Sequence, residues 1–441
     1  YVYKSTNKGQ TWKSISSNLP EKSHSWRIVQ DHIKKNLLFL GTEFGIYFSV
    51  NAGETWTQLS GNVPTIPFRD LAIHKRENDL VGATFGRGFY VFDDMSVFRS
   101  LSDNQMKSKA TLFPVRKALW YIPRSFLGGS GKASQGDAYY IAPNPPFGAV
   151  FTYHLSEGFM TKAEKRREKE KKNSKSVGFP GWDAVEAEHR EMKPKIIFEV
   201  RDSDGDVVRR IDGPASKGFH RIAWDLRYPN PYALPLDREK VTGSGYLAMP
   251  GKYSVTMYSV VDGKTQKLSQ SQQFDVTPLR KGALPSKDYA ETFNFLRGVE
   301  KTFKKVTAIQ ISVSNTLKKV KSMNVALAQS NADVGFMDEE LSKLRDSLLE
   351  MDEELNGKRS KGEPGEKNNP TVYTRLYTAA RIASGSTYGP TKLALDNLAL
   401  ANKRITVIEK QLTANNQMII NLSYELRQAG APWVEGDEIP D

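Results

Sequence analysis

The chain has 441 residues, with 63 Lys and Arg against 50 Asp and Glu, which gives a formal charge of +13. This charge favours anionic partners in general, but nucleic-acid binding is not expected, because the sequence contains no recognised nucleic-acid module. The chain has no cysteine, which excludes disulfides, thiolate metal sites and a cysteine nucleophile.

Two copies of one eight-residue turn lie near the start of the chain. Both follow the pattern Ser-x-Asn-x-Gly-x-Thr-Trp, and their first residues are 44 positions apart. A turn that recurs at the length of one four-stranded unit is typical of a β-propeller. The Asn side chain can bond nearby backbone N–H groups, Gly accepts positive φ, and Trp packs over the turn. We therefore expect a structural role for Ser5, Asn7, Gly9, Thr11, Trp12, Ser49, Asn51, Gly53, Thr55 and Trp56.

Alternating strands surround the two turns. The first turn joins the last two strands of one unit, residues 26–59 make a complete second unit, and residues 68–93 make a third. About two and a half units cannot close a ring, because propellers have roughly four to eight blades. We therefore expect residues 1–118 to be the C-terminal blades of a propeller. The other blades would come from the N-terminal part of the same protein, on one chain or as a separate fragment.

Residues 119–280 predict a second β domain. Short alternating strands with turn residues between them favour an immunoglobulin-like sandwich, with Trp224 as its core anchor. A run of mixed charge within residues 158–193 interrupts the strands and is expected to be an exposed insertion.

One loop of this domain has a carboxylate at every second position, the spacing found at the start of a calcium-binding loop. Its residues are Asp202, Asp204 and Asp206, but no bidentate Glu follows at the calcium-loop position, and the Asp-Gly step is an ordinary hairpin signal. We expect a plain hairpin, with calcium as the alternative, and predict no metal site.

Residues 284–432 change to an apolar period between three and four. Three long aliphatic stripes and one shorter stripe predict an α-helical bundle or hairpin, followed by a tail over 433–441. The fold class is thus multidomain, mainly β and then α. The stripes are expected to form an intramolecular core, with a partner-binding surface as the alternative. No apolar run approaches the roughly 20 residues of a membrane span.

Four charged residues on blade strands or loops are candidates for ligand binding, namely Glu43, Arg69, Arg87 and Asp93. A glycosidase needs two carboxylates roughly 5 to 10 Å apart on one sugar, and nothing in the sequence pairs these residues. We therefore predict no catalytic residue and no cofactor.

Several short sequence segments, taken in chain order, are similar to segments of a known protein family. They are residues 41–49, 86–94, 145–149, 220–227 and 422–430. They resemble exported bacterial proteins with a sortilin-like BNR (Asp-box) repeat propeller, an Ig-like domain and a helical C-terminal region, often called glycosyl hydrolase-like. The resemblance implies the periplasm, the outer-membrane surface or the exterior. It supplies no catalytic residue, because a fold does not fix chemistry.

Together these observations predict a non-catalytic cell-envelope propeller protein, an interaction scaffold or receptor in an outer-membrane-associated assembly. It would be peripheral rather than transmembrane, and its partners would be its own N-terminal blades, other envelope proteins and, as an option, a glycan. The alternative is a secreted glycoside hydrolase, sialidase-like or xyloglucanase-like, whose active site lies largely in the N-terminal blades.

Overall fold

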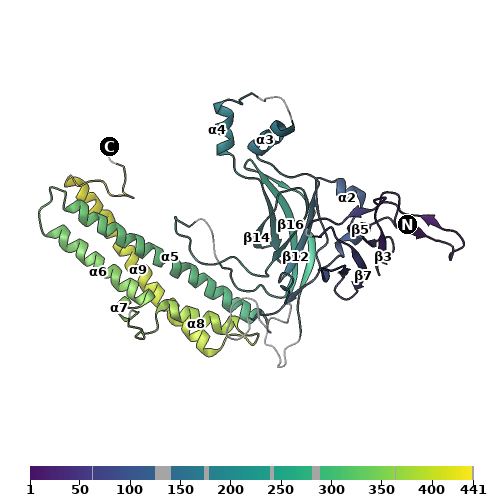
Figure 1. The fold of residues 1–441 in the computed structure, drawn as a ribbon. Coiled ribbons are helices and arrows are strands. Elements are labelled where there is room, and N and C mark those ends of the chain that lie inside the picture. Colours follow the sequence, from purple (N-terminus) through teal and green to yellow (C-terminus); the bar gives the residue numbers. More distant parts are fainter. Residues whose placement is uncertain are drawn as a thin grey trace. The chain divides into compact units, whose positions relative to one another are not determined.

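The computed structural model describes residues 1–61, 63–124, 141–172, 178–238, 243–280, 289–362 and 364–439, without the side chain of Asp103. Its described parts form two compact units, each built from separate segments of the chain. The first unit draws on residues 1–119, 125–225 and 251–277, and the second on 120–124, 226–250 and 278–441. Figure 1 shows strands through the first part of the chain and helices in the last part. The expected order of β and then α structure is confirmed.

The described residues up to 92 form three antiparallel sheets. A two-stranded sheet pairs β1 (Tyr3–Lys4) with β2 (Lys13–Ser14). A four-stranded sheet has the order β3 (Ser25–Gln30), β4 (Leu38–Thr42), β5 (Gly45–Ser49) and β6 (Thr57–Gln58). A three-stranded sheet has the order β7 (Phe68–His74), β8 (Asp79–Thr84) and β9 (Phe89–Phe92). These bounds agree within about two residues with the alternation of the sequence.

The four-stranded and three-stranded sheets pack on each other through a shared apolar core. Phe39 and Ile46 from the first sheet and Phe68 and Leu80 from the second are buried in it. A Cβ at Gly41 would lie 2.6 Å from the Phe68 carbonyl oxygen, so a larger residue would push the sheets apart. Two short helices follow these sheets, α1 (Val97–Ser100) and α2 (Asp103–Lys107).

Two further sheets lie in the first unit, except for the last residues of β11 and β18, Trp120 and Pro278, which belong to the second unit. A three-stranded sheet has the order β10 (Ala110–Leu112), β12 (Ala149–Leu155) and β15 (Gly218–Trp224). A six-stranded sheet has the order β11 (Ala118–Trp120), β18 (Gln272–Pro278), β16 (Gly251–Val261), β13 (Lys195–Arg201) and β14 (Val207–Gly213), with β17 (Lys264–Lys267) on β16.

Aromatic side chains fill the space between these two sheets. Phe151 on β12 stacks on Phe198 of β13 with ring centroids 6.0 Å apart, and Trp224 on β15 meets Tyr253 of β16 at 5.1 Å. Trp224, the expected core anchor, is fully buried. The sheets therefore pack face to face, as two half-apolar sheets must to hide their inner faces from water.

The charged insertion forms two exposed helices, α3 (Lys162–Lys172) and α4 (Trp182–Arg190), neither of which has a buried residue. Arg166 joins them through a hydrogen bond of 2.8 Å to Glu188. Asp202 closes the β13–β14 hairpin, because its carboxylate accepts from the backbone N–H groups of Asp204 and Asp206. Among the described residues no group of three His, Cys, Asp or Glu side chains is placed to hold a metal ion.

The second unit contains the helices α5 (Tyr289–Leu327), α6 (Phe336–Asn356), α7 (Arg359–Gly362), α8 (Val372–Ser384) and α9 (Lys392–Gln428). Their stripes of apolar residues form one core, which includes Val299, Leu344, Leu376 and Ile408. No helix in the described chain is long and apolar enough to cross a membrane.

The compact units divide the chain differently from the expected domain bounds. Residues 226–250 were expected in the sandwich domain, but they belong to the helical unit. There Tyr228 lies 5.7 Å from the ring of Phe293, and Tyr232 lies 5.4 Å from the ring of Phe303. Likewise β10, which lies within the residues 1–118 that were expected to be propeller blades, pairs with β12.

Candidate functional site

Strand register places several of the predicted residues at one end of two neighbouring sheets. Thr42 pairs with Gly45, so Glu43 lies in the turn between β4 and β5, and Ser25 at the start of β3 pairs with the same Thr42. Phe68 at the start of β7 pairs with Thr84 at the end of β8. This pairing places the start of β7 beside the turn between β8 and β9.

Four residues meet there in what we call the turn cluster, namely Trp26, Glu43, Arg69 and Phe85. The indole N–H of Trp26 donates to Glu43 Oε2 at 2.9 Å. The Arg69 guanidinium lies over the Trp26 ring, 3.6 Å from its centroid, and 5.1 Å from the centre of the Phe85 ring. Residues from two sheets and two turns therefore form one contiguous set.

The turn cluster is exposed, although it consists largely of aromatic surface. Phe85 is 68% exposed and the neighbouring Phe44 is 46% exposed. Exposed aromatic rings beside a carboxylate and a guanidinium offer both apolar faces and hydrogen-bonding groups, a combination that is enriched at binding surfaces. Such an arrangement can contact a partner side chain or a sugar ring by stacking and orient it by hydrogen bonds.

The predicted site residues divide into two groups. Glu43 and Arg69 come together, and Arg87 lies exposed in the same turn as Phe85. Asp93 instead follows β9 at the opposite end of its strand, where Arg221 donates to its backbone carbonyl. Desolvation and the nearby Asp79 carboxylate raise the pKa of Asp93, and Arg221 opposes this shift.

Sequence reasoning missed Trp26 and Phe85. Phe85 sits in a turn whose sequence echoes the turn at Phe44, and an aromatic residue repeated in two strand-joining turns is a signal for surface binding that could have been followed. Trp26 has no comparable local signal, since its role depends on Arg69 from another sheet.

The second repeated turn lies at the other end of β5 from the turn cluster. Ser49 ends β5, whereas Glu43 precedes it, so the turn beginning at Ser49 and the cluster are separated by the length of that strand. In both turns the Asn side chain accepts from the Thr backbone N–H and donates to the Thr hydroxyl, with distances between 2.8 and 3.0 Å. This geometry fits a structural role, because each Asn bonds within its own turn.

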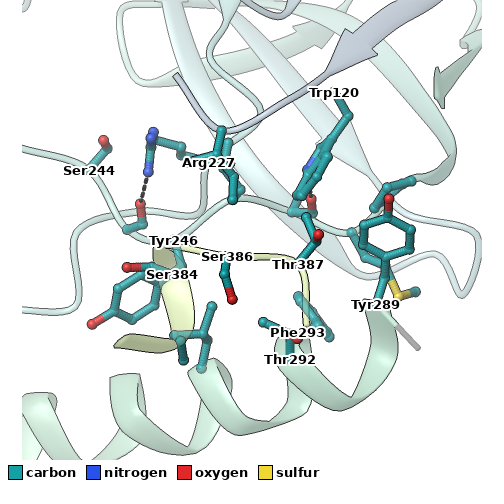
Figure 2. Close-up of a pocket in the computed structure, with 18 residues that line it drawn as sticks. Trp120, Arg227, Ser244, Tyr246, Tyr289, Thr292, Phe293, Ser384, Ser386 and Thr387 are labelled. Atoms are coloured by element: carbon teal, nitrogen blue, oxygen red, sulfur yellow. Dashed lines mark hydrogen bonds between the residues drawn. The ribbon is translucent and has the colours of Figure 1, made fainter. Parts of the chain in front are cut away.

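A pocket of about 220 Å³ lies within the helical unit, and we call it the helical pocket. Figure 2 shows the rings of Trp120, Tyr289 and Phe293 along it, with Ser386 and Thr387 between these rings and Tyr246. The Trp120 indole N–H is already used, because it donates to the Ala248 carbonyl at 2.8 Å. The residues that line the helical pocket come from β11 and the loop after it, the segment before β16, the start of α5, and the end of α8 with the loop after it.

One polar atom of the helical pocket is unusual. The hydroxyl oxygen of Thr292, in the first turn of α5, is buried and has no hydrogen-bond partner. Burial raises the pKa of Tyr246, which therefore stays a neutral phenol at physiological pH. The pocket thus combines aromatic walls with an unsatisfied hydroxyl.

No family model and no curated protein matches the chain. Among solved structures, it is similar to a crystal structure described as the extracellular domain of a one-component system from B. thetaiotaomicron. The identity is 13%, the TM-score is 0.16, and the match covers 62% of this chain and 28% of the other.

Proposed function

We propose that this chain is a non-catalytic interaction module of the bacterial cell envelope, acting as a scaffold or receptor that binds its partner through the turn cluster. The observation that carries this proposal is the contact of Arg69 with Trp26 and Phe85, which holds exposed aromatic surface in a fixed arrangement beside Glu43. Such preorganised aromatic and Arg side chains supply most of the affinity at many interfaces. The partner would be another envelope protein, with a glycan as the second candidate.

The architecture that we propose for this role is the one that the family resemblance implies. The two turns of one sequence pattern and the four-stranded sheet with strands in sequence order support blades of an Asp-box propeller. The aromatic core between two facing antiparallel sheets supports an Ig-like sandwich. In this arrangement the N-terminal blades of the same protein would extend the ring beside the turn cluster.

The hydrolase alternative is less well supported by the charges at the turn cluster. A glycosidase needs one carboxylic acid and one carboxylate facing a shared sugar. Glu43 accepts from the Trp26 indole, and Asp70 pairs with Arg27 at 3.1 Å. Both carboxylates are thus engaged with neighbouring side chains.

Site-specific photo-crosslinking tests the proposal. The photoreactive analogue p-benzoylphenylalanine would replace Phe85 in one variant and Phe179, which is also exposed in the first unit, in a control variant. In cells that produce the protein naturally, irradiation should give a discrete crosslinked product from position 85 alone. Arg69→Ala should remove this product, because the substitution deletes the stacked guanidinium, whereas Arg76→Ala should leave it unchanged.

The proposal is overturned if positions 85 and 179 crosslink alike or if Arg69→Ala has no effect. A parallel assay distinguishes the alternative function. Release of sugar from sialyllactose or from xyloglucan oligosaccharides by the purified protein would support a hydrolase instead.

A further inference from the structure

We propose that the helical pocket is a second binding site, which takes a small neutral aromatic molecule carrying a hydroxyl group. This site lies in the helical unit and is independent of the function proposed for the turn cluster. The structure carries the inference through the volume of the pocket, the chemistry of its walls and the unsatisfied hydroxyl of Thr292.

The volume sets the size of the ligand. A dry cavity of about 150 Å³ lined by apolar side chains is large enough to hold benzene. The helical pocket has about 220 Å³, which allows one substituted aromatic ring or two fused rings. A peptide or a sugar chain would extend beyond that volume.

The walls set the chemical class. Trp120 and Tyr289 meet edge to face with ring centroids 5.3 Å apart, and Phe293 and Leu296 from α5 extend the apolar lining. Aromatic pairs of this geometry extend readily to a third ring, because the edge of one ring attracts the face of another. Aromatic ligands therefore gain both apolar burial and ring contacts in this pocket.

The charged groups that line the helical pocket limit which small molecules it can bind. Among the described residues that line the pocket, none has a carboxylate, so a protonated amine would lose its hydration without gaining an anionic partner. The guanidinium of Arg227 donates to the Gly245 carbonyl at 3.2 Å (Figure 2). A neutral ligand is favoured on these grounds.

Thr292 supplies the polar contact. A buried hydroxyl without a partner costs about 1 to 3 kcal/mol relative to one that is hydrogen-bonded. The side chain of Thr292 lines the pocket, but its hydroxyl oxygen has less than 1 Å² of exposed surface, so bonding a ligand requires the side chain to turn about χ1. After that turn the hydroxyl can accept from or donate to the ligand. A phenolic hydroxyl can play either part, and its bond to Thr292 would remove the penalty.

The test compares 4-methylphenol with toluene, which has the same ring and methyl group but no hydroxyl, by isothermal titration calorimetry and ligand-observed NMR on the full chain. We expect 4-methylphenol to bind with 1:1 stoichiometry and more tightly than toluene. Thr292→Val should weaken 4-methylphenol about fivefold to tenfold, the equivalent of one hydrogen bond, and leave toluene unchanged. The control Thr406→Val, on the exposed face of α9, should change neither affinity.

A filling variant tests the location. Ser386→Phe places a ring in the middle of the pocket and should abolish binding of both probes, while the melting temperature reports whether this variant is folded. Independently of any variant, bound 4-methylphenol should show intermolecular nuclear Overhauser effects to the Trp120 indole. The proposal is wrong if neither probe binds up to millimolar concentration, if Thr292→Val weakens both probes equally, or if the bound ring shows no contact with Trp120.

Discussion

At the scale of single residues, the same turn sequence has two different surroundings. Trp56 is buried, and its indole N–H donates to the Ile15 carbonyl at 2.7 Å, while Asn18 bonds both the N–H and the carbonyl of Trp56. Trp12, in the first copy, is 64% exposed. The pattern Ser-x-Asn-x-Gly-x-Thr-Trp therefore predicts the hydrogen bonds inside a turn, but not how much of the turn is packed.

This difference predicts unequal effects from equal substitutions. Asn51→Ala removes three hydrogen bonds from a turn that packs on Ile15, because the Asn51 side chain accepts from the Ser49 hydroxyl and from Thr55 N–H and donates to the Thr55 hydroxyl. It should lower the free energy of unfolding by about 1 to 2 kcal/mol. Asn7→Ala removes the three matching hydrogen bonds from the exposed turn and should lower the free energy of unfolding by less. Urea unfolding followed by tryptophan fluorescence measures both.

Asn51→Asp serves as the control for this comparison. A carboxylate can still accept from the Thr55 backbone N–H and from its hydroxyl, so the stability of this variant should stay near that of the unmodified protein. Equal losses for Asn7→Ala and Asn51→Ala would contradict the idea that packing over the turn sets its contribution.

At the scale of elements, an ion pair between Arg99 and Asp31 connects the segments that follow β3 and β7. Arg99 on α1 makes two hydrogen bonds to Asp31, of 2.9 and 3.0 Å, and a third to Asn78 in the turn between β7 and β8. The Asp31 side chain is fully buried. Burial alone would raise the pKa of Asp31, but the hydrogen bonds from Arg99, Lys34 N–H and Ile33 N–H outweigh it and hold the pKa below its ordinary value.

A lowered pKa fixes the direction of the pH dependence. Because the carboxyl titrates at lower pH in the folded state than in the unfolded state, its stabilisation is present above about pH 4, the unfolded pKa, and is lost as pH falls through the folded pKa. Asp31→Asn leaves the partly buried Arg99 guanidinium without a carboxylate partner and should cost up to about 3 kcal/mol at pH 7. The difference from the unmodified protein should shrink steadily between pH 5 and pH 2.

Denaturant unfolding at several pH values measures this effect. Asp70→Asn is the matched control, since Asp70 pairs with Arg27 at the surface and such pairs contribute at most about 1 kcal/mol. A loss for Asp31→Asn that is independent of pH would mean that the carboxylate acts through packing and not through its charge.

The elements themselves could largely be predicted from the sequence, and their partners could not. Alternation predicted β3 to β9, and aliphatic stripes predicted α5, α6, α8 and α9. Both patterns are local, because apolar residues recur at the spacing that places them on the buried face of a strand or a helix. The pairing of β10 with β12 and the contact of Arg69 with Trp26 join residues far apart in sequence, and no period records such contacts. For the same reason Glu43 and Arg69 were candidates individually, but the turn cluster was not predicted as a set.

On the scale of the whole molecule, the helical unit takes in three separate segments of the chain. In the described parts of segment 226–250, residues 226–238 and 243–250, the backbone has an isolated bridge between Arg227 and Leu247 but no helix or named strand that would mark it as part of a helical domain. Their Tyr228, Tyr232 and Tyr246 nevertheless pack on the helices, the first two against ring neighbours on α5 and the third against the apolar core. Segment 226–250 is therefore a structural part of this unit, although the helical stripes start some 40 residues later.

A fragment of residues 278–441 alone should consequently be helical but poorly packed. Removing three tyrosines from the surface of the bundle exposes the apolar area that they cover, and each large side chain contributes about 1.5 to 3 kcal/mol when fully buried. For a unit of this size a loss of about 5 kcal/mol lowers the melting temperature by roughly 10 to 20 °C. Circular dichroism at 222 nm, with the full chain as reference, gives the melting temperature of the helices.

A second fragment separates the packing of the tyrosines from the length of the chain. In it, residues 226–250 are joined to residue 278 by a flexible Gly/Ser linker, and the matched control carries the same segment with Tyr228, Tyr232 and Tyr246 all changed to Ser. The joined segment should restore most of the lost melting temperature, and the Ser version should not, because only the aromatic rings cover α5 and the core. If the fragment without residues 226–250 has the same melting temperature as the helices of the full chain, residues 278–441 form a stable bundle alone. The segment 226–250 would then contribute nothing to its stability.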